Sequence, residues 1–328
     1  MPDNLTLRPF RNENDYTHLA DILTASENAD SLPVTVSAAN LAESLSKSPR
    51  FDLFRDLVIA EVDGQEIGFG RVHWWEEPSR RTYRLTGYLR PQWRHKGIGR
   101  VLLSWLEERA WAIAWEHPTT APSYLHINTT QYQVGLQALV RETGYEIKES
   151  WVLMVRPSLE NIPDTPLPEG LEVRPALPEQ FPAIWYAVEE AYEPEGGHQP
   201  TGVIPEDIKN DPNFQPELWQ VAWEVSSGKV VGSVMTYINH AENKYLGILR
   251  GFTEGISTVP GWQRRGVARA LIARSLKAQR EAGMTESALV CNGEKPNNYK
   301  LYASCGFQEV KRDTVYEKTA LTPASPPR

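Results

Sequence analysis

The pattern of hydrophobic and polar positions along the 328-residue chain predicts strands and helices that occur twice in the same order. Alternating positions indicate strands, and apolar positions at i, i+3 and i+4 indicate helices. In the second half the expected elements are strands over 219–225, 230–237 and 255–259, a helix over 267–282, a strand over 287–291, a helix over 298–304 and a strand over 307–311. The order predicts an α/β fold in which each copy forms a mixed, mostly antiparallel sheet flanked by helices.

The duplication is supported by four landmarks that recur in the same order about half a chain apart. The pairs are Arg8 and Arg174, Gly68 and Gly232, Gly97 and Gly266, and Gly144 and Gly306. Each pair occupies the same context, namely the end of an early strand, a hairpin strand, a turn before a helix, and a turn before the last strand. A repeated supersecondary pattern of this kind predicts two tandem domains.

The two copies define the expected domain limits. We expect one domain over residues 1–157 and a second over residues 171–319. The segment 158–170 is rich in proline and polar residues, which predicts a linker. The segment 320–328 predicts a disordered tail.

Composition and charge restrict the function only moderately. The chain is 41% hydrophobic and 23% charged, which is typical of globular proteins. A net charge of -8 disfavours a nucleic-acid partner. The sequence contains no apolar stretch long enough to span a membrane and no signal-peptide pattern. With two cysteines, Cys291 and Cys305, and no metal-ligand spacing, we expect a cytoplasmic protein without a metal. The oligomeric state stays open.

Two glycine turns at helix starts carry the candidate binding chemistry. The first turn comprises Arg94, His95, Lys96, Gly97, Ile98 and Gly99, and the second comprises Gln263, Arg264, Arg265, Gly266, Val267 and Ala268. Backbone N–H groups and the helix dipole at such a turn favour a phosphate. Arg264 and Arg265 would add positive charge there, or they are simply solvated cations.

Both turns match the pattern [Gln/Arg]-x-x-Gly-x-[Gly/Ala], and the second copy adds Tyr302-x-x-x-Gly306-Phe307. With these motifs each copy resembles a GNAT-type N-acetyltransferase domain, over residues 5–155 and 171–318. The whole chain resembles a tandem GNAT protein. The resemblance implies acetyl-CoA as co-substrate and an acyl transfer to a primary amine.

The resemblance also places acetyl-CoA on the second copy. The turn would hold its pyrophosphate, and its thioester arm would lie along Ser257, Thr258 and Val259. A backbone N–H of that strand could polarise the thioester carbonyl as the oxyanion forms.

Two side chains are expected to move protons. By resemblance, Tyr302 protonates the departing CoA thiolate, since a phenol is protonated at neutral pH. The alternative is a tyrosine that packs in the core. Glu254 is the candidate base that takes a proton from the ammonium. In a regular strand it shares a face with Ile256 and Thr258. The alternative is a solvated glutamate.

The first copy lacks both groups. Counting from the shared motifs puts Val140 at the position of Tyr302 and Leu85 at the position of Glu254. We therefore hypothesise that the first domain has lost acetyl transfer, and that it binds CoA or is purely structural. The counterpart of a common family asparagine before Tyr302 is Glu294, which puts that local CoA contact in doubt.

The acceptor is expected to contact the segment 189–217, which is acidic. Its carboxylates are Glu189, Glu190, Glu193, Glu195, Glu206, Asp207, Asp211 and Glu217. An acidic mouth would attract a cationic small molecule or a peptide amine; otherwise the segment is a solvated loop. A different class of function, a non-catalytic acyl-CoA-binding or sensing protein, is the alternative to an enzyme.

Overall fold

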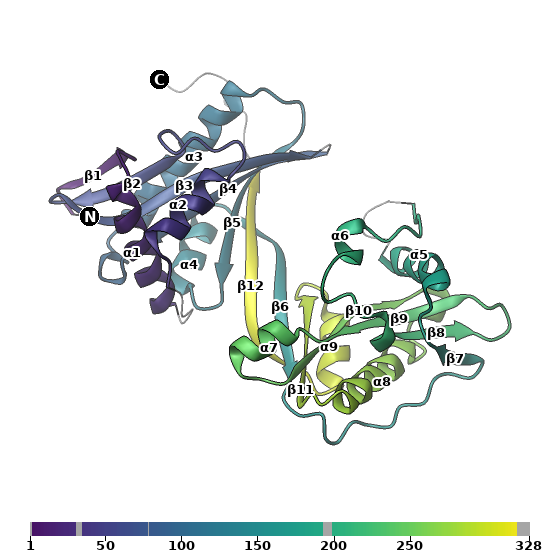
Figure 1. Cartoon of the computed structure of the whole chain (residues 1–328). Coiled ribbons are helices and arrows are strands. Elements are labelled where there is room, and N and C mark those ends of the chain that lie inside the picture. Colours follow the sequence, from purple (N-terminus) through teal and green to yellow (C-terminus); the bar gives the residue numbers. More distant parts are fainter. Residues whose placement is uncertain (1, 31–34, 78, 193–198, 320–328) are drawn as a thin grey trace. The chain divides into compact units, whose positions relative to one another are not determined.

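The computed structural model describes residues 2–30, 35–77, 79–192 and 199–319, which form two compact units (Figure 1). The first unit comprises the chain up to Ser150 together with the segment that begins at Asp313. The second unit comprises Trp151–Arg312. The segment 320–328, expected to be a tail, lies outside the described residues.

The first unit is a mixed sheet flanked by helices. Its strands are β1 (Leu5–Pro9), β2 (Leu57–Val62), β3 (Gln65–Glu77), β4 (Arg80–Leu89) and β5 (Ser123–Thr130), and its helices are α1 (Asn14–Ala29), α2 (Ala38–Ser46), α3 (Ile98–Glu116) and α4 (Val134–Glu142). The strand order is β1-β2-β3-β4-β5, and only β4 and β5 pair in parallel. Leu103, Leu106 and Ala110 of α3 are buried against the sheet at helical spacing.

The second unit repeats this arrangement. Its strands are β7 (Leu171–Arg174), β8 (Gln220–Glu224), β9 (Val230–Tyr237), β10 (Arg250–Thr258) and β11 (Glu286–Asn292), and its helices are α5 (Phe181–Tyr192), α6 (Glu206–Lys209), α7 (His240–Leu246), α8 (Val267–Glu281) and α9 (Pro296–Ser304). The order is β7-β8-β9-β10-β11, with β10 and β11 parallel. Helix α8 packs on one face of β9 and β10 and α5 on the other (Figure 1). The predicted α/β fold with two such domains is confirmed.

The last strand of each copy begins in its own unit and ends in the other unit. In β12 (Gln308–Thr319), residues from Asp313 onward pair antiparallel with β5 of the first unit. In β6 (Glu146–Arg156), residues from Trp151 onward pair antiparallel with β11 of the second unit. The units therefore differ from the expected ranges 1–157 and 171–319, because strand pairing between the copies is a tertiary choice that local sequence does not specify.

The second unit also contains two features that the sequence pattern did not indicate. Helix α7 lies between β9 and β10, whereas in the first unit β3 ends at Glu77 and β4 begins at Arg80. The segment expected to be a linker packs on the second unit: Leu159 is buried in its core, and the Leu159 N–H donates to the Thr285 carbonyl (3.0 Å).

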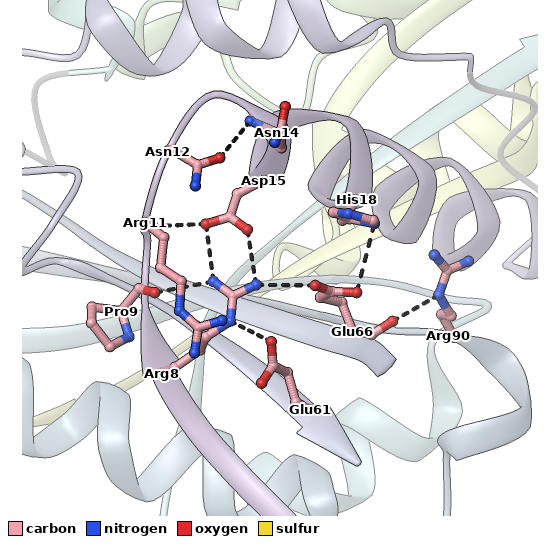
Figure 2. Close-up of polar contacts among 10 residues, drawn as sticks. All are labelled: Arg8, Pro9, Arg11, Asn12, Asn14, Asp15, His18, Glu61, Glu66 and Arg90. Carbon is pink, nitrogen blue, oxygen red and sulfur yellow. Dashed lines mark hydrogen bonds and ion pairs between the residues drawn. The ribbon is translucent and has the colours of Figure 1, made fainter. Parts of the chain in front are cut away.

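A buried arginine ties the first strand of the first unit to its neighbours. Figure 2 shows the Arg8 guanidinium bound in bidentate fashion to Asp15 at 2.8 and 2.9 Å, and bound also to Glu61 and Glu66. Arg8 is 7% exposed. Because a buried guanidinium needs all of its donors satisfied, these carboxylates hold β1 to α1, β2 and β3.

Candidate functional site

The glycine turn of the second unit is formed by an unusual backbone path. A short helical turn over Pro260–Trp262 precedes it, and Arg264 (φ 59°) and Gly266 (φ 91°) both adopt left-handed conformations. Glycine makes the second of these conformations possible without strain. The turn is exposed from Gln263 to Gly266, so its N–H groups at the start of α8 are open to a phosphate.

Two side chains hold this turn in place. The Gln263 side-chain amide donates to the Thr258 carbonyl (3.2 Å), which links the turn to the end of β10. The Arg265 guanidinium lies over the Trp262 ring at 5.0 Å. Gln263 therefore positions the turn, while Arg265 stays at the exposed surface as a positive charge.

The strand that leads to the turn separates from its parallel neighbour. β10 and β11 pair only from Arg250 to Phe252 and from Glu286 to Ala288. Pairing with β11 ends there, so beyond Phe252 the β11-facing edge of β10 pairs with no strand among the residues that the structure describes. This is the place where an extended ligand arm can pair with the backbone of β10.

The register assigns one backbone donor to that edge. Val259 N–H donates to the Val231 carbonyl (3.0 Å), and Ser257 pairs with Ser233, so Val259 is committed to β9. Since antiparallel bonding alternates along a strand, the Thr258 N–H points away from β9, toward the gap. Of the three residues Ser257, Thr258 and Val259, Thr258 is thus the one able to polarise a carbonyl there.

Glu254 lies at the point of divergence. Its carboxylate accepts a hydrogen bond from the Val290 N–H across the gap (2.7 Å). Burial raises the pKa of Glu254 to about 7, and the Val290 hydrogen bond opposes this shift. A carboxyl that titrates near neutral pH can take up and release a proton under ordinary conditions.

The prediction that Glu254 lies on one face with Ile256 and Thr258 was wrong, because the strand is not regular. A β-bulge lies between Glu254 and Ser257, at Gly255 (φ 56°), where a Cβ would lie 2.9 Å from Met235. The extra residue reverses the alternation, so Glu254 shares a face with Ser257 rather than with Ile256 and Thr258.

Tyr302 lies in α9, is 7% exposed and packs in the main core of the second unit. Burial raises the pKa of its hydroxyl, and Tyr192, Cys291 and Glu254 raise it further. The phenol is therefore protonated at neutral pH and lies within electrostatic range of Glu254. The two alternatives for Tyr302, core packing and chemistry, are compatible in this position.

Tyr192 is a residue near the gap that sequence reasoning did not select. From the end of α5, its hydroxyl donates to the Ile256 carbonyl within the bulge (3.0 Å). It lies close enough to Tyr302 to raise that residue's pKa. No local motif marks Tyr192, because the contact depends on how α5 packs on β10.

The turn of the first unit has the same backbone, with left-handed His95 (φ 60°) and Gly97 (φ 82°). Its Arg94 is not free: the guanidinium binds Asp30 (2.6 Å) and Ser26 (2.8 Å) of the α1 end. Lys96 lies over the Trp93 ring at 4.6 Å. Among the described residues, the Ile98 and Gly99 N–H groups at the start of α3 donate to no backbone carbonyl, so they can bind an anion.

The chemical positions of the first unit are apolar or neutral. Val140 is fully buried, as expected for a core residue. The counterpart of Glu254 is not Leu85, because β4 has no bulge: Met235 pairs with Glu254, and its equivalent Arg71 pairs with Thr86. Thr86 therefore occupies the position of Glu254, one residue later than counting indicated, and no carboxylate stands there.

Within the described part of the chain, no group of three or more His, Cys, Asp or Glu side chains could hold a metal ion. Over the same residues, no helix is long and apolar enough to cross a membrane.

Comparison with known proteins identifies the family. A family model described as an acetyltransferase (GNAT) domain matches residues 54–147 and 216–309. The chain thus belongs to the GNAT acetyltransferases, with one such domain in each half. It is an acetyltransferase, and enzymes of this family use acetyl-CoA as co-substrate.

Curated relatives cover most of the chain. A mycothiol acetyltransferase of Pseudarthrobacter chlorophenolicus is 24% identical over 310 residues, which cover 90% of each protein. A mycothiol acetyltransferase of Thermobifida fusca is 26% identical over 69% of this chain and 71% of its own. An aminoglycoside N(6')-acetyltransferase of Stenotrophomonas maltophilia is 35% identical over 89 residues, covering 27% of this chain and 55% of that protein.

Solved structures share the fold. A GCN5-related N-acetyltransferase from Sphaerobacter thermophilus superposes with a TM-score of 0.66 at 22% identity, covering 98% of this chain and 97% of its own. A tandem GNAT protein from the clavulanic acid biosynthesis pathway superposes with a TM-score of 0.56 at 13% identity, covering 98% and 100%.

Proposed function

We propose that the second unit transfers an acetyl group from acetyl-CoA to a primary amine of a small cationic molecule or a peptide. One observation carries this proposal. Glu254, with a pKa near 7, bridges the gap between β10 and β11, and the protonated Tyr302 lies within its electrostatic range. A base and an acid close to one another can take a proton from the ammonium and give a proton to the departing thiolate, which amide formation from a thioester needs.

In this proposal the exposed turn over Gln263–Ala268 holds the pyrophosphate of acetyl-CoA. The arm follows the unpaired edge of β10, and the thioester oxygen meets the Thr258 N–H. Glu254 takes a proton from the ammonium, directly or through water. The neutral amine attacks the carbonyl carbon, and the Thr258 N–H stabilises the oxyanion. The C–S bond breaks, and Tyr302 gives its proton to the CoA thiolate. The attacking nitrogen loses its second proton, which restores the Tyr302 phenol through water and leaves a neutral amide. The products are the N-acetylated amine and CoA.

The first unit has no part in the chemistry in this proposal. Thr86 and Val140 replace the carboxylate and the phenol, and neither can act as base or acid at neutral pH. Its glycine turn keeps the phosphate-binding backbone. We propose that the first unit is catalytically degenerate.

The proposal that the acceptor is a cation rests on the residues around Glu254 on its face of the sheet. Tyr237 lies beside it on β9 and stacks on Phe252 (4.8 Å). Burial raises the pKa of Tyr237, and the negative charges of Glu254, Glu242 and Asp211 raise it further. Three carboxylates near one partly exposed ring favour a cation.

The acidic segment 189–217 contributes less to this surface than its composition indicated. Glu189 is engaged by Thr201 N–H (2.6 Å) and Gly202 N–H (2.8 Å), so it orders a loop. Glu193 and Glu195 lie outside the described residues. Asp211 is the member that lies near Tyr237, and Glu242 of α7 joins it from outside the segment.

Thiol release from acetyl-CoA tests the proposal. The acceptor panel should include spermidine, kanamycin, a lysine peptide and the acceptor of the mycothiol acetyltransferases. Release that depends on an amine, with mass-spectrometric detection of the acetylated product, supports the proposal. Saturable CoA binding without release for any amine would support the non-catalytic acyl-CoA-binding alternative instead.

A further inference from the structure

The first unit has an unusual set of residues where the second unit places its acceptor face. Both units have a last parallel pair before the central strands diverge: Phe252 with Ala288 in the second unit, and Arg84 with His126 in the first. Arg84 also pairs with His73 on β3, as Phe252 pairs with Tyr237 on β9. Mostly apolar residues of the second unit thus correspond to basic residues of the first.

Arg71 completes this basic set, because it occupies the position of Met235. Arg71 pairs with Thr86, and Met235 pairs with Glu254. Cross-strand geometry makes Arg71 and Arg84 diagonal neighbours on one face, roughly 7 Å apart. We call Arg71, His73, Arg84 and His126 the basic face.

The two arginines of the basic face lack counter-charges. Neither guanidinium makes a hydrogen bond or an ion pair with any residue that the structure describes. Arg84 lies over the Trp75 ring at 5.1 Å. Arg71 is partly buried. Arg84 is exposed. By contrast, the buried Arg8 and Arg81 of the same unit each bind carboxylates.

The histidines are already partnered and leave the arginines as the positive charges. His73 Nε2 lies 3.2 Å from the Pro49 carbonyl, and His126 lies 2.7 Å from Asn128 Oδ1 and 3.5 Å from Glu317. Glu317 is shared with Arg80 at 2.5 Å.

The positive charges of the basic face repel one another. Burial lowers the pKa of Arg71, Tyr88 opposes this shift, and the charge of Arg84 lowers the pKa again. Burial also lowers the pKa of His73 and His126, and Arg84 contributes to both shifts. Like charges that repel one another without a structural partner are typical of a site for an opposite charge.

We infer that the basic face of the first unit binds a small anion that carries a carboxylate or a phosphate, between Arg71 and Arg84. Guanidinium groups bind both kinds of oxyanion through paired hydrogen bonds. The site lies beside the gap where β4 and β5 diverge, at the position where the second unit receives its acceptor. The duplicated fold thus holds ligands of opposite charge at equivalent positions.

Isothermal titration calorimetry on the full-length protein tests this inference, with succinate and inorganic phosphate as probes. Arg71→Met installs the residue that the second unit has at this position. Arg84→Met changes an exposed position of the same face. It serves as the test if Arg71→Met disturbs folding. Arg11→Met removes an exposed arginine of the same unit and is the control.

The inference predicts saturable binding of succinate or phosphate to the wild type, weakened at least tenfold by Arg71→Met or Arg84→Met and unchanged in Arg11→Met. Binding of succinate would show that the site takes a carboxylate, and binding of inorganic phosphate would show that it takes a phosphate. Thermal unfolding without ligand should show Arg71→Met at least as stable as the wild type, because a partly buried unpaired charge is removed. The inference is overturned if neither probe binds the wild type, or if binding to both variants matches binding to the wild type.

Discussion

The pKa of Glu254 connects activity with stability and gives the sharpest prediction. In the folded state burial raises its pKa from 4.5 to about 7, so folding favours the neutral carboxyl. That stabilisation is fully present below the unfolded pKa and is lost as the pH rises through the folded pKa. Between pH 4.5 and pH 7 the wild type therefore loses folding free energy at this residue.

Glu254→Gln keeps an acceptor for the Val290 N–H but stays neutral at every pH. Linkage predicts that the variant is more stable than the wild type by roughly 1 kcal/mol at pH 5 and roughly 3 kcal/mol at pH 8. Activity should change in the opposite direction: a lost general base costs about 10²- to 10⁴-fold in kcat. In the wild type, kcat/KM should fall about tenfold for each pH unit below 7.

Urea unfolding at pH 5 and pH 8, followed by circular dichroism, measures the stability difference. Glu160→Gln changes an exposed carboxyl of the same unit and is the matched control. It should leave the free energy of unfolding unchanged at both pH values. If Glu254→Gln gains no stability at pH 8, or gains as much at pH 5, folding does not raise the pKa of this carboxyl and its role as base loses its physical basis.

Three other predictions follow from the same contacts. Tyr302→Phe should lower kcat about 10²-fold with an unchanged KM for acetyl-CoA, measured by thiol release; a variant with normal turnover would remove the tyrosine from the chemistry. Gly266→Val should raise the KM for acetyl-CoA at least tenfold, because a β-branched residue is strained at φ 91°, whereas the matched Gly97→Val in the first unit should leave the rate unchanged; equal effects would argue against chemistry in the second unit alone. Arg8→Met should destabilise the protein by about 3–5 kcal/mol in urea unfolding, because it leaves buried carboxylates unpaired. Burial raises the pKa of Asp15, but Arg8 and the Arg11 N–H lower it, and the net shift is downward. This stabilisation is therefore present above the unfolded pKa of 3.8 and should fade as the pH falls below it. An unchanged unfolding midpoint for Arg8→Met would contradict this explanation.

Much of the candidate site could be predicted from local sequence. The glycine turns depend on a few adjacent residues, so their backbone is encoded where it forms, and both have the expected left-handed glycine at a helix start. Tyr302 was selected from the Tyr-x-x-x-Gly-Phe motif and Glu254 from its place on the run that ends at Thr258, and the structure places them within electrostatic range of one another. Equivalent landmarks also identified the duplication, because each copy repeats the same local pattern.

The sequence by itself determined the α/β class, the duplication and the two glycine turns, because each depends on residues that are close in the chain. Only the tertiary structure decided how the copies share their last strands, since β12 and β6 could pair with either sheet. It also decided that the bulge at Gly255 turns Glu254 to the opposite face and makes Thr86 its counterpart. The basic face arises in the same way: Arg71 and Arg84 are distant in sequence, and only strand register brings their charges together.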